Sequence, residues 1–160
     1  MIVHPATTDD AAAMAEILNG LIAAGGTTAL ETPLTPKQMA QWITQHPGRS
    51  AWHVCVGADD RILGFQLAEP HPNLPDDAID IASFARIGAG GQGVGAALFA
   101  ATSAACRSLG YAWINASIRS DNRSGLIYYT RMGFVDWHSD PVARLSDGTV
   151  TGKTHKRFDL

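Results

Sequence analysis

Apolar positions at the start of the chain follow first a strand spacing and then a helix spacing. Residues 2–5 form a short apolar run that ends at a proline, which predicts a strand. From Ala11 to Ile22, apolar side chains recur every three or four positions, which predicts an amphipathic helix over residues 9–23. The helix is expected to end at Gly25, because glycine readily adopts the conformation that closes a helix.

The next segments predict a second helix and two strands. The helix is expected to begin at Pro36, because proline at the first helical position loses no hydrogen bond, and to end at Pro47. Strands are predicted at 51–56 and 62–68, joined by a tight polar turn. Residues 69–77 contain three prolines and are expected to form a loop.

The second half of the chain continues this alternation. A mostly apolar strand at 78–85 leads into a glycine-rich segment. In chain order, the further predictions are a helix at 94–109, a strand at 111–118, a helix at 122–132, and strands at 134–137 and 153–158 around a polar turn at 146–149. The order β-α-α-β-β-β-α-β-α-β-β predicts an α/β chain with one mixed sheet and helices on its faces.

The composition is that of one folded domain. The chain has 160 residues, enough to bury a core, and we treat residues 1–160 as a single domain. With 46% hydrophobic and 17% charged residues, it does not resemble a disordered chain. The net charge of −3 gives no reason to expect a nucleic acid or an anionic membrane as partner.

The sequence also bears on compartment and metal binding. The N-terminal segment lacks the basic and apolar regions of a signal peptide, and no stretch approaches the ~20 apolar residues of a membrane span, so a cytoplasmic protein is expected. Cys55 and Cys106 form no motif and are expected to be buried thiols. Among the scattered histidines, only His53 shares a strand face with a cysteine, so no metal site is expected.

The most distinctive pattern is a cluster of five glycines between Gly88 and Gly95, directly before a predicted helix. Such a loop can turn consecutive amides toward one point, and the helix start adds unpaired N–H groups, which predicts an anion cradle. The Gly-Lys-Ser/Thr of a Walker loop is missing. The spacing Gly88, Gly90, Gly93 fits a dinucleotide-binding fingerprint, but it lies in mid-chain without the expected acidic residue further on. A plain glycine-rich turn is the other alternative.

Two motifs together resemble the GNAT acyltransferase superfamily. The segment ending in Gly93-Val94-Gly95 is similar to its Q/R-x-x-G-x-G/A loop, although Gly90 stands where Gln or Arg is usual. Residues 122–134 resemble its second signature, N-x-x-(S/A)-x-x-x-Y-x-x-x-G-F. The pattern is closest to the phosphinothricin N-acetyltransferase-like subgroup. The resemblance implies a mixed, mostly antiparallel sheet of about seven strands with about four helices.

The resemblance implies acetyl-CoA as the co-substrate. In the superfamily, the strand before the glycine loop splays from its neighbour, and its free edge pairs with the pantetheine arm. The pyrophosphate would bind the backbone amides of Gly91, Gln92, Gly93, Gly95 and Ala96. The other cofactor contacts implied are Phe84, Ala85, Arg86, Gly90, Val94, Asn122 and Tyr129.

The resemblance also suggests catalytic roles. Tyr129 occupies the general-acid position, from which a phenol could give a proton to the departing thiolate. Tyr128 lies about 100° away around the helix and is expected to face elsewhere. A backbone N–H near Ala85 would meet the oxyanion. Asp80 interrupts an apolar strand and stands at the spacing of a proposed catalytic glutamate of the subgroup; an Asp that faces solvent at a strand edge is the other interpretation.

The acceptor is expected to be a small-molecule primary amine. Thr28, Glu31 and His71 are the predicted substrate-binding residues, and the segment from Leu18 to Pro33 resembles the helix and loop near the substrate in that subgroup. Glu31, Glu69 and His71 are further candidates for the base. The loop at 69–77 lacks the arginines that suit an amino-acid carboxylate, and its acids favour a cationic amine.

The predicted function is therefore acetyl transfer from acetyl-CoA to such an amine by direct attack in a ternary complex. The alternatives are a CoA-binding regulatory module with little catalysis, and acetylation of a protein N-terminus or lysine. A homodimer is expected by analogy with relatives.

Overall fold

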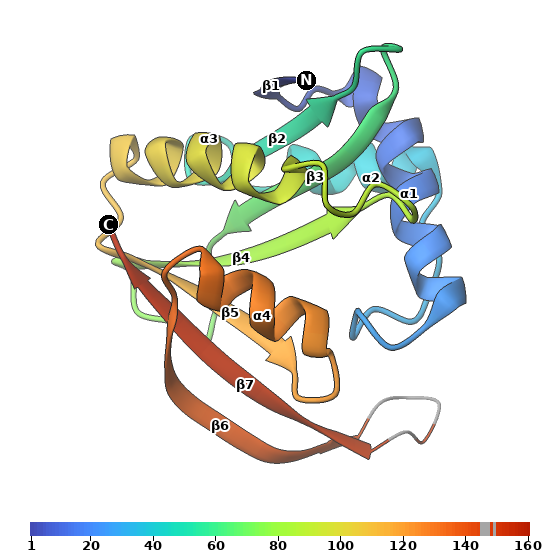
Figure 1. The fold of residues 1–160 in the computed structure, drawn as a ribbon. Helices are drawn as coiled ribbons and strands as arrows, with labels where there is room; N and C mark the ends of the chain where they lie inside the picture. Colours follow the sequence, from blue (N-terminus) through green and yellow to red (C-terminus); the bar gives the residue numbers. More distant parts are fainter. Residues whose placement is uncertain (145–147, 149) are drawn as a thin grey trace.

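The computed structural model describes residues 1–144, 148 and 150–160. In this part of the chain, one seven-stranded sheet is covered by helices (Figure 1). In chain order the elements are β1 (Ile2–Pro5), a 3-10 turn (Thr8–Asp10), α1 (Ala11–Ala24), α2 (Pro36–Ile43), β2 (Ala51–Val56), β3 (Ile62–Glu69), β4 (Ala78–Ala85), α3 (Val94–Ser108), β5 (Trp113–Arg119), α4 (Arg123–Arg131), β6 (Val135–Arg144) and β7 (Val150–Asp159). The predicted α/β class and order of elements are confirmed.

Strand pairing opens the sheet at its centre. The strand order is β1-β2-β3-β4-β5-β7-β6, and β4 and β5 run parallel while the other neighbours are antiparallel. The β4–β5 register extends only from Ala78↔Trp113 to Ile81↔Ala116. Beyond that point β4 continues to Ala85 along β3, and β5 turns away with β7 (Figure 1). The two strands therefore form a V, as the resemblance implied.

Helix ends follow the predicted local chemistry. Thr35 caps α2, since its hydroxyl accepts a hydrogen bond from the Gln38 amide at 3.1 Å while Pro36 takes the first helical position. Gly25 closes α1 with a φ of 71°. Asn122 caps α4 by accepting from the Gly125 amide at 3.0 Å.

The last hairpin is longer than predicted. β6 was expected to end at residue 137 but extends to Arg144, and β7 begins at Val150 rather than at 153. β6 is an edge strand, and its register shifts between Asp140 and Ala143, on either side of Pro141. An edge position and a bulge are where a strand accommodates a proline. In the predicted turn at 146–149, only Gly148 lies within the described residues.

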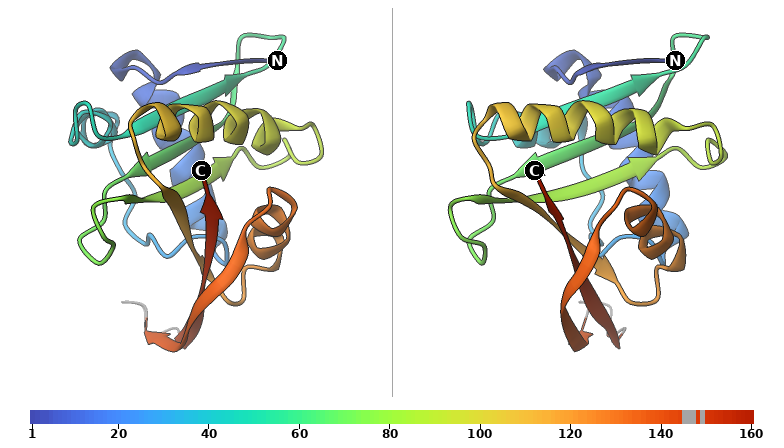
Figure 2. Two further views of the ribbon diagram at one scale, coloured as in Figure 1. Left: turned by 90° about the vertical axis from the view of Figure 1, so that its left-hand side faces the viewer. Right: turned by 60° about the vertical axis from the view of Figure 1, so that its left-hand side comes forward.

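One pair of helices covers each face of the sheet (Figure 2). α1 and α2 pack on one face through a cluster that includes Met14, Leu18 and Met39. α3 and α4 pack on the other face, where Phe99 and Phe134 are buried. Among the described residues, none of the helices combines the length and apolar character needed to cross a membrane.

Candidate active site

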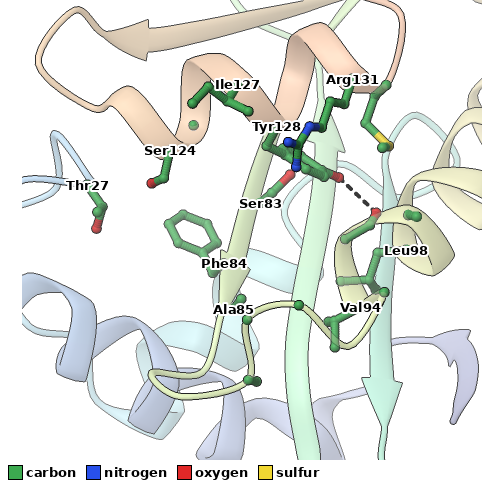
Figure 3. A pocket seen from close by; sticks show the side chains of 18 of the residues that line it. Thr27, Ser83, Phe84, Ala85, Val94, Leu98, Ser124, Ile127, Tyr128 and Arg131 are labelled. Carbon is green, nitrogen blue, oxygen red and sulfur yellow. Dashed lines mark hydrogen bonds between the residues drawn. The ribbon is translucent and has the colours of Figure 1, made fainter.

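A hollow lies where β4 separates from β5. It has a volume of about 680 Å³ and extends from the end of β4 over the glycine loop to α4 (Figure 3). Nine of the predicted cofactor residues line it: Phe84, Ala85, Gly90, Gly91, Gly93, Val94, Gly95, Ala96 and Asn122. We call this hollow the cofactor cleft. Two sequence motifs that are distant along the chain thus meet on opposite walls of one cleft.

The glycine loop presents backbone amides to this cleft. Gly88, Gly91 and Gly93 have φ values of 88°, 76° and 79°, in the left-handed region that favours glycine. α3 begins directly afterwards, and its first backbone hydrogen bond joins the Ala97 amide to the Gly93 carbonyl at 3.0 Å. The preceding amides of the first turn have no partner within the helix and stand at the positive end of its dipole. The loop has the geometry of an anion site, which suits a pyrophosphate.

Tyr128 contradicts the expectation that it faces elsewhere. Its hydroxyl donates to the Gly95 carbonyl at 2.8 Å and joins α4 to the first turn of α3 (Figure 3). Its ring lies 4.8 Å from that of Tyr129, between centroids. Neighbouring helical side chains leave the backbone about 100° apart, but two long rings can still converge at their tips.

Three predicted cofactor residues, Arg86, Gln92 and Tyr129, are not among the residues that line the cleft. Arg86 turns away: its guanidinium pairs with Glu16 at 2.5 Å and donates to the Ile62 carbonyl at 2.9 Å. An arginine that is already paired is poorly available to a phosphate, which argues against a phosphate contact of this side chain. Gln92 is exposed and lies outside the lining residues. Among the described residues that line the cleft, Arg131 on α4 is the one Lys or Arg.

A second hollow, the acceptor pocket, has a volume of about 320 Å³. It contains Asp80 and Tyr129 together with the predicted substrate residues Thr28 and His71, whereas Glu31 is not among its lining residues. The residues that line both hollows are Thr27, Ser83, Phe84, Asn122, Gly125 and Tyr128. The two hollows therefore meet at the opening between β4 and β5.

Two carboxylates stand side by side in the acceptor pocket. Glu69 on β3 is directly opposite Asp80 on β4. Asp80 accepts a hydrogen bond from the Asn115 amide nitrogen at 2.8 Å, and Glu69 accepts from the Trp42 indole at 3.0 Å. Burial raises the pKa of both carboxyls above the ordinary values, and the charge of Glu69 raises that of Asp80 further. A carboxylate with a raised pKa is a suitable base for an ammonium group.

Tyr129 reaches the site through another hydroxyl. It is only 6% exposed, and its oxygen lies 2.8 Å from Ser83 Oγ. Buried Gln66 links Ser83 to Tyr128, because its amide nitrogen donates to Ser83 Oγ at 2.7 Å and to Tyr128 Oη at 3.1 Å. Burial raises the pKa of Tyr129 well above that of a free phenol. Sequence reasoning missed Gln66 and Ser83, which lie on ordinary strand segments without a motif.

Asn122 links the two hollows structurally. While its side-chain oxygen caps α4, its amide nitrogen donates to the Thr27 carbonyl at 3.1 Å. Nearby, Arg119 donates to the Thr28 carbonyl at 3.1 Å. The loop after α1 is thereby fastened to the β5–α4 turn and forms one side of both hollows.

A third hollow of about 440 Å³ adjoins the acceptor pocket and contains a cluster on β6 and β7. The two oxygens of Asp140 lie 3.0 Å from His138 Nε2 and 2.7 Å from His155 Nε2, and these contacts lower the pKa of Asp140. In the described part of the chain, these three groups are within 4.8 Å of one another. Lys153 stands opposite Asp140, and its positive charge disfavours a bound cation. The sequence missed the cluster because β6 was predicted to end before it.

Comparisons with known proteins were made for the whole chain. No protein-family model matches the sequence. A phosphinothricin N-acetyltransferase from Streptomyces coelicolor is 25% identical over 137 residues, covering 82% of this chain and 80% of that protein.

Solved structures of other proteins superpose on this chain over almost its whole length. A GNAT superfamily phosphinothricin acetyltransferase from Sinorhizobium meliloti, in complex with AcCoA, has a TM-score of 0.89 at 20% identity, over 99% of this chain and 88% of the other. A ribosomal-protein-alanine N-acetyltransferase from Brucella melitensis has a TM-score of 0.90 at 18% identity, over 100% of both chains. The chain has the fold of the GNAT superfamily, and its homologues in sequence and structure include phosphinothricin N-acetyltransferases of that superfamily.

Proposed function

We propose that this protein is an acetyl-CoA-dependent N-acetyltransferase that acts on a small-molecule primary amine. One observation carries the proposal: a cleft lined by the glycine loop and a pocket with a half-buried carboxylate open into each other where β4 leaves β5. A direct transfer needs this arrangement, because both substrates must meet at one carbon atom. The AcCoA complex of a relative with the same fold supports the choice of cofactor.

The cofactor would bind through backbone more than through side chains. The amides from Gly91 to Ala96 would hold the pyrophosphate, with Arg131 as the basic side chain nearby. The pantetheine arm would lie along β4 from Ala82 to Ala85, where the β5 partner is missing. This arm would bring the thioester into the opening of the V, with a β4 amide near Ala85 available to the oxyanion.

The amine would enter from the acceptor pocket. Asp80 lines that pocket but not the cofactor cleft, and its raised pKa makes it a better base for an ammonium group than an ordinary aspartate. The free amine would then attack the thioester carbon. The hydroxyl pair of Ser83 and Tyr129 lies where the sulfur would depart.

The side of the pocket formed by Glu69 and Asp80 favours a cationic amine, while Arg119 and Lys153 also line the pocket. Glu69 and Asp80 are both hydrogen-bonded to neutral donors, and the loop from Pro70 to Asp77 carries no Arg or Lys that would pair with an anionic substrate. A substrate carboxylate there would face two like charges. We therefore propose that the amino group of the substrate binds beside Glu69 and Asp80.

The test combines binding with turnover. Calorimetry with acetyl-CoA should show saturable binding, and thiol release should depend on an added amine. The panel should contain amino acids paired with the corresponding amines that lack the carboxylate, and peptides with free N-termini. Lack of saturable binding would refute the proposal. Binding without turnover on any amine would instead support a CoA-binding module, and a preference for peptides would support a protein acetyltransferase.

A further inference from the structure

The hydroxyl hydrogen of Tyr129 has one hydrogen-bond acceptor among the described residues. The side chain is buried, and in the described part of the chain its hydroxyl has Ser83 Oγ as its hydrogen-bond partner, at 2.8 Å. Leaving a buried O–H without an acceptor is unfavourable, because the group gives up its hydrogen bonds to water and gains none in return. Tyr129 is therefore the donor and Ser83 the acceptor in this hydrogen bond.

The second acceptor site of Ser83 is also fixed. The Tyr128 hydroxyl donates its own hydrogen to the Gly95 carbonyl, so Tyr128 Oη must accept from the other neighbour, Gln66. This places the amide nitrogen of Gln66, not its oxygen, toward Tyr128. The second hydrogen of that nitrogen then points to Ser83 Oγ at 2.7 Å. In this orientation the buried Gln66 Oε1 has no hydrogen-bond partner among the described residues, whereas a reversed amide would bring that oxygen against Tyr128 Oη with no hydrogen between them.

Ser83 consequently keeps its own hydrogen free. A serine hydroxyl has one hydrogen and two acceptor sites, and both acceptor sites are used, by Tyr129 and by Gln66. Ser83 lines both the cofactor cleft and the acceptor pocket, whereas Tyr129 lines only the pocket. Figure 3 shows Ser83 beside Tyr128, followed along β4 by Phe84 and Ala85. The free hydrogen is thus available at the junction of the two hollows.

We propose that Ser83 is the direct hydrogen-bond donor to the sulfur of CoA as it leaves, and that Tyr129 is a positioning residue which turns the Ser83 hydroxyl toward the cleft. This inference rests on the proposed function. It assigns to Ser83 the contact that the sequence motif assigns to Tyr129. A catalytic serine at this place cannot be read from the motif, because it depends on how Gln66 and Tyr128 use their hydrogens.

The bonds and protons balance without an additional reactant. The amine nitrogen forms a bond to the acetyl carbon, the carbon–sulfur bond breaks, and the electron pair stays on sulfur. Ser83 stabilises the resulting thiolate by a hydrogen bond and keeps its proton. An ammonium group loses two protons when it becomes an amide, and Asp80 accepts each of them in turn. One proton is passed through water to the sulfur of CoA, and the other is released to solvent.

The first experiment uses the product complex and needs no amine. The pKa of the CoA thiol, when CoA is bound to the protein, is read from the ultraviolet absorbance of the thiolate. A hydrogen bond from Ser83 should make this pKa about one unit lower in the wild type than in Ser83→Ala. Ser83→Thr keeps the hydroxyl and should retain the lower pKa. If the Ser83→Ala complex has the same thiol pKa as the wild type, the inference is wrong.

The second experiment compares kcat among folded variants. Ser83→Ala should lower kcat by about 10- to 100-fold with the dissociation constant of acetyl-CoA unchanged, and Ser83→Thr should recover most of the loss. Tyr129→Phe should have a smaller effect, and none when added to Ser83→Ala. A larger loss in Tyr129→Phe than in Ser83→Ala would overturn the inference and favour Tyr129 as the direct donor. Failure of the wild type to bind CoA would overturn the proposed function as well.

Discussion

Gly95 and Tyr128 are in contact because Gly95 has no side chain. A Cβ placed on Gly95 would lie 2.5 Å from Cε2 of the Tyr128 ring, closer than carbon atoms approach without a shift. The Tyr128 hydroxyl also donates to the Gly95 carbonyl at 2.8 Å. The start of α3, which presents amides to the cofactor cleft, is therefore joined to the helix that carries both tyrosines.

Replacing Gly95 by alanine should weaken cofactor binding and lower stability. In an exposed helix, glycine to alanine ordinarily stabilises by about 0.5–1 kcal/mol. At Gly95 the new methyl group must displace Tyr128, so we expect a lower Tm and at least a tenfold higher Kd for acetyl-CoA, measured by thermal unfolding and calorimetry. Gly20→Ala in α1 is the matched control, since its Cβ would meet nothing within 4 Å, and it should raise Tm. Equal effects of the two variants would contradict this account.

The glycine loop should depend on backbone conformation more than on side chains. Gly93 has a φ of 79°, and a Cβ there would meet only Met1, at 3.8 Å, so any loss in Gly93→Ala reflects backbone strain of about 1 kcal/mol or more. We expect Gly93→Ala to raise the Kd for acetyl-CoA by about tenfold. Gln92→Ala, in an exposed residue of the same loop, should change Kd less than twofold. A larger effect of Gln92→Ala would show that the anion is held by side chains.

Asp80→Asn should remove the base without disturbing the cofactor. Because burial raises the pKa of Asp80, kcat/KM in the wild type should rise with pH through a value above that of an ordinary aspartate. In Asp80→Asn this part of the profile should disappear, and kcat should fall by about 10²- to 10⁴-fold with the Kd for acetyl-CoA unchanged. Asp77→Asn, in the exposed loop, is the control.

The same carboxyl should leave a signature in stability. A raised pKa means that the native state binds more protons than the unfolded state between the two pKa values, so the free energy of unfolding falls as pH rises through that window. Glu69 contributes with the same sign. Denaturant unfolding should therefore show a smaller fall with pH in Asp80→Asn than in the wild type. If the free energy of unfolding has the same pH dependence in Asp80→Asn as in the wild type, the Asp80 carboxyl is solvated in the native state and its pKa is not raised.

The helices and strands were predictable because local chemistry decides them. Thr35 with Pro36, and Gly25 after α1, act within a few residues of their own positions, and the structure keeps these boundaries. The predicted end of β6 at residue 137 was wrong, because a proline such as Pro141 normally interrupts a strand. An edge strand has no partner on one side, so a bulge can absorb the proline there.

The candidate site was only half visible in the sequence. The glycine loop could be recognised because its backbone favours glycine at three closely spaced positions, Gly88, Gly91 and Gly93. Gln66 and Ser83 could not, because they meet Tyr129 only through the β3–β4 register and the packing of α4. Arg86 is the opposite case. Its position next to the glycine motif predicted a contact with the cofactor, but its guanidinium is paired with Glu16 on α1.

Both cysteines should be unreactive in the native protein, which makes the thiol-release assay feasible. Cys55 and Cys106 are fully buried, and burial raises the pKa of Cys106 to about 12 and that of Cys55 above its usual value. At pH 8 an aromatic disulfide reagent should therefore detect less than one thiol per chain in the absence of CoA, and two after unfolding in guanidinium. Rapid reaction of the native protein would contradict the burial of both residues.

Asn122→Ala should separate the two roles of that residue when compared with Thr35→Ala. Both substitutions remove an N-cap and should destabilise by about 1 kcal/mol, seen as similar shifts in the denaturant midpoint. Only Asn122 also donates to the Thr27 carbonyl and lines both hollows. We therefore expect Asn122→Ala to raise the Kd for acetyl-CoA and the KM for the amine several-fold, and Thr35→Ala to leave both unchanged. If the two variants lose activity only in proportion to stability, Asn122 is a helix cap and nothing more.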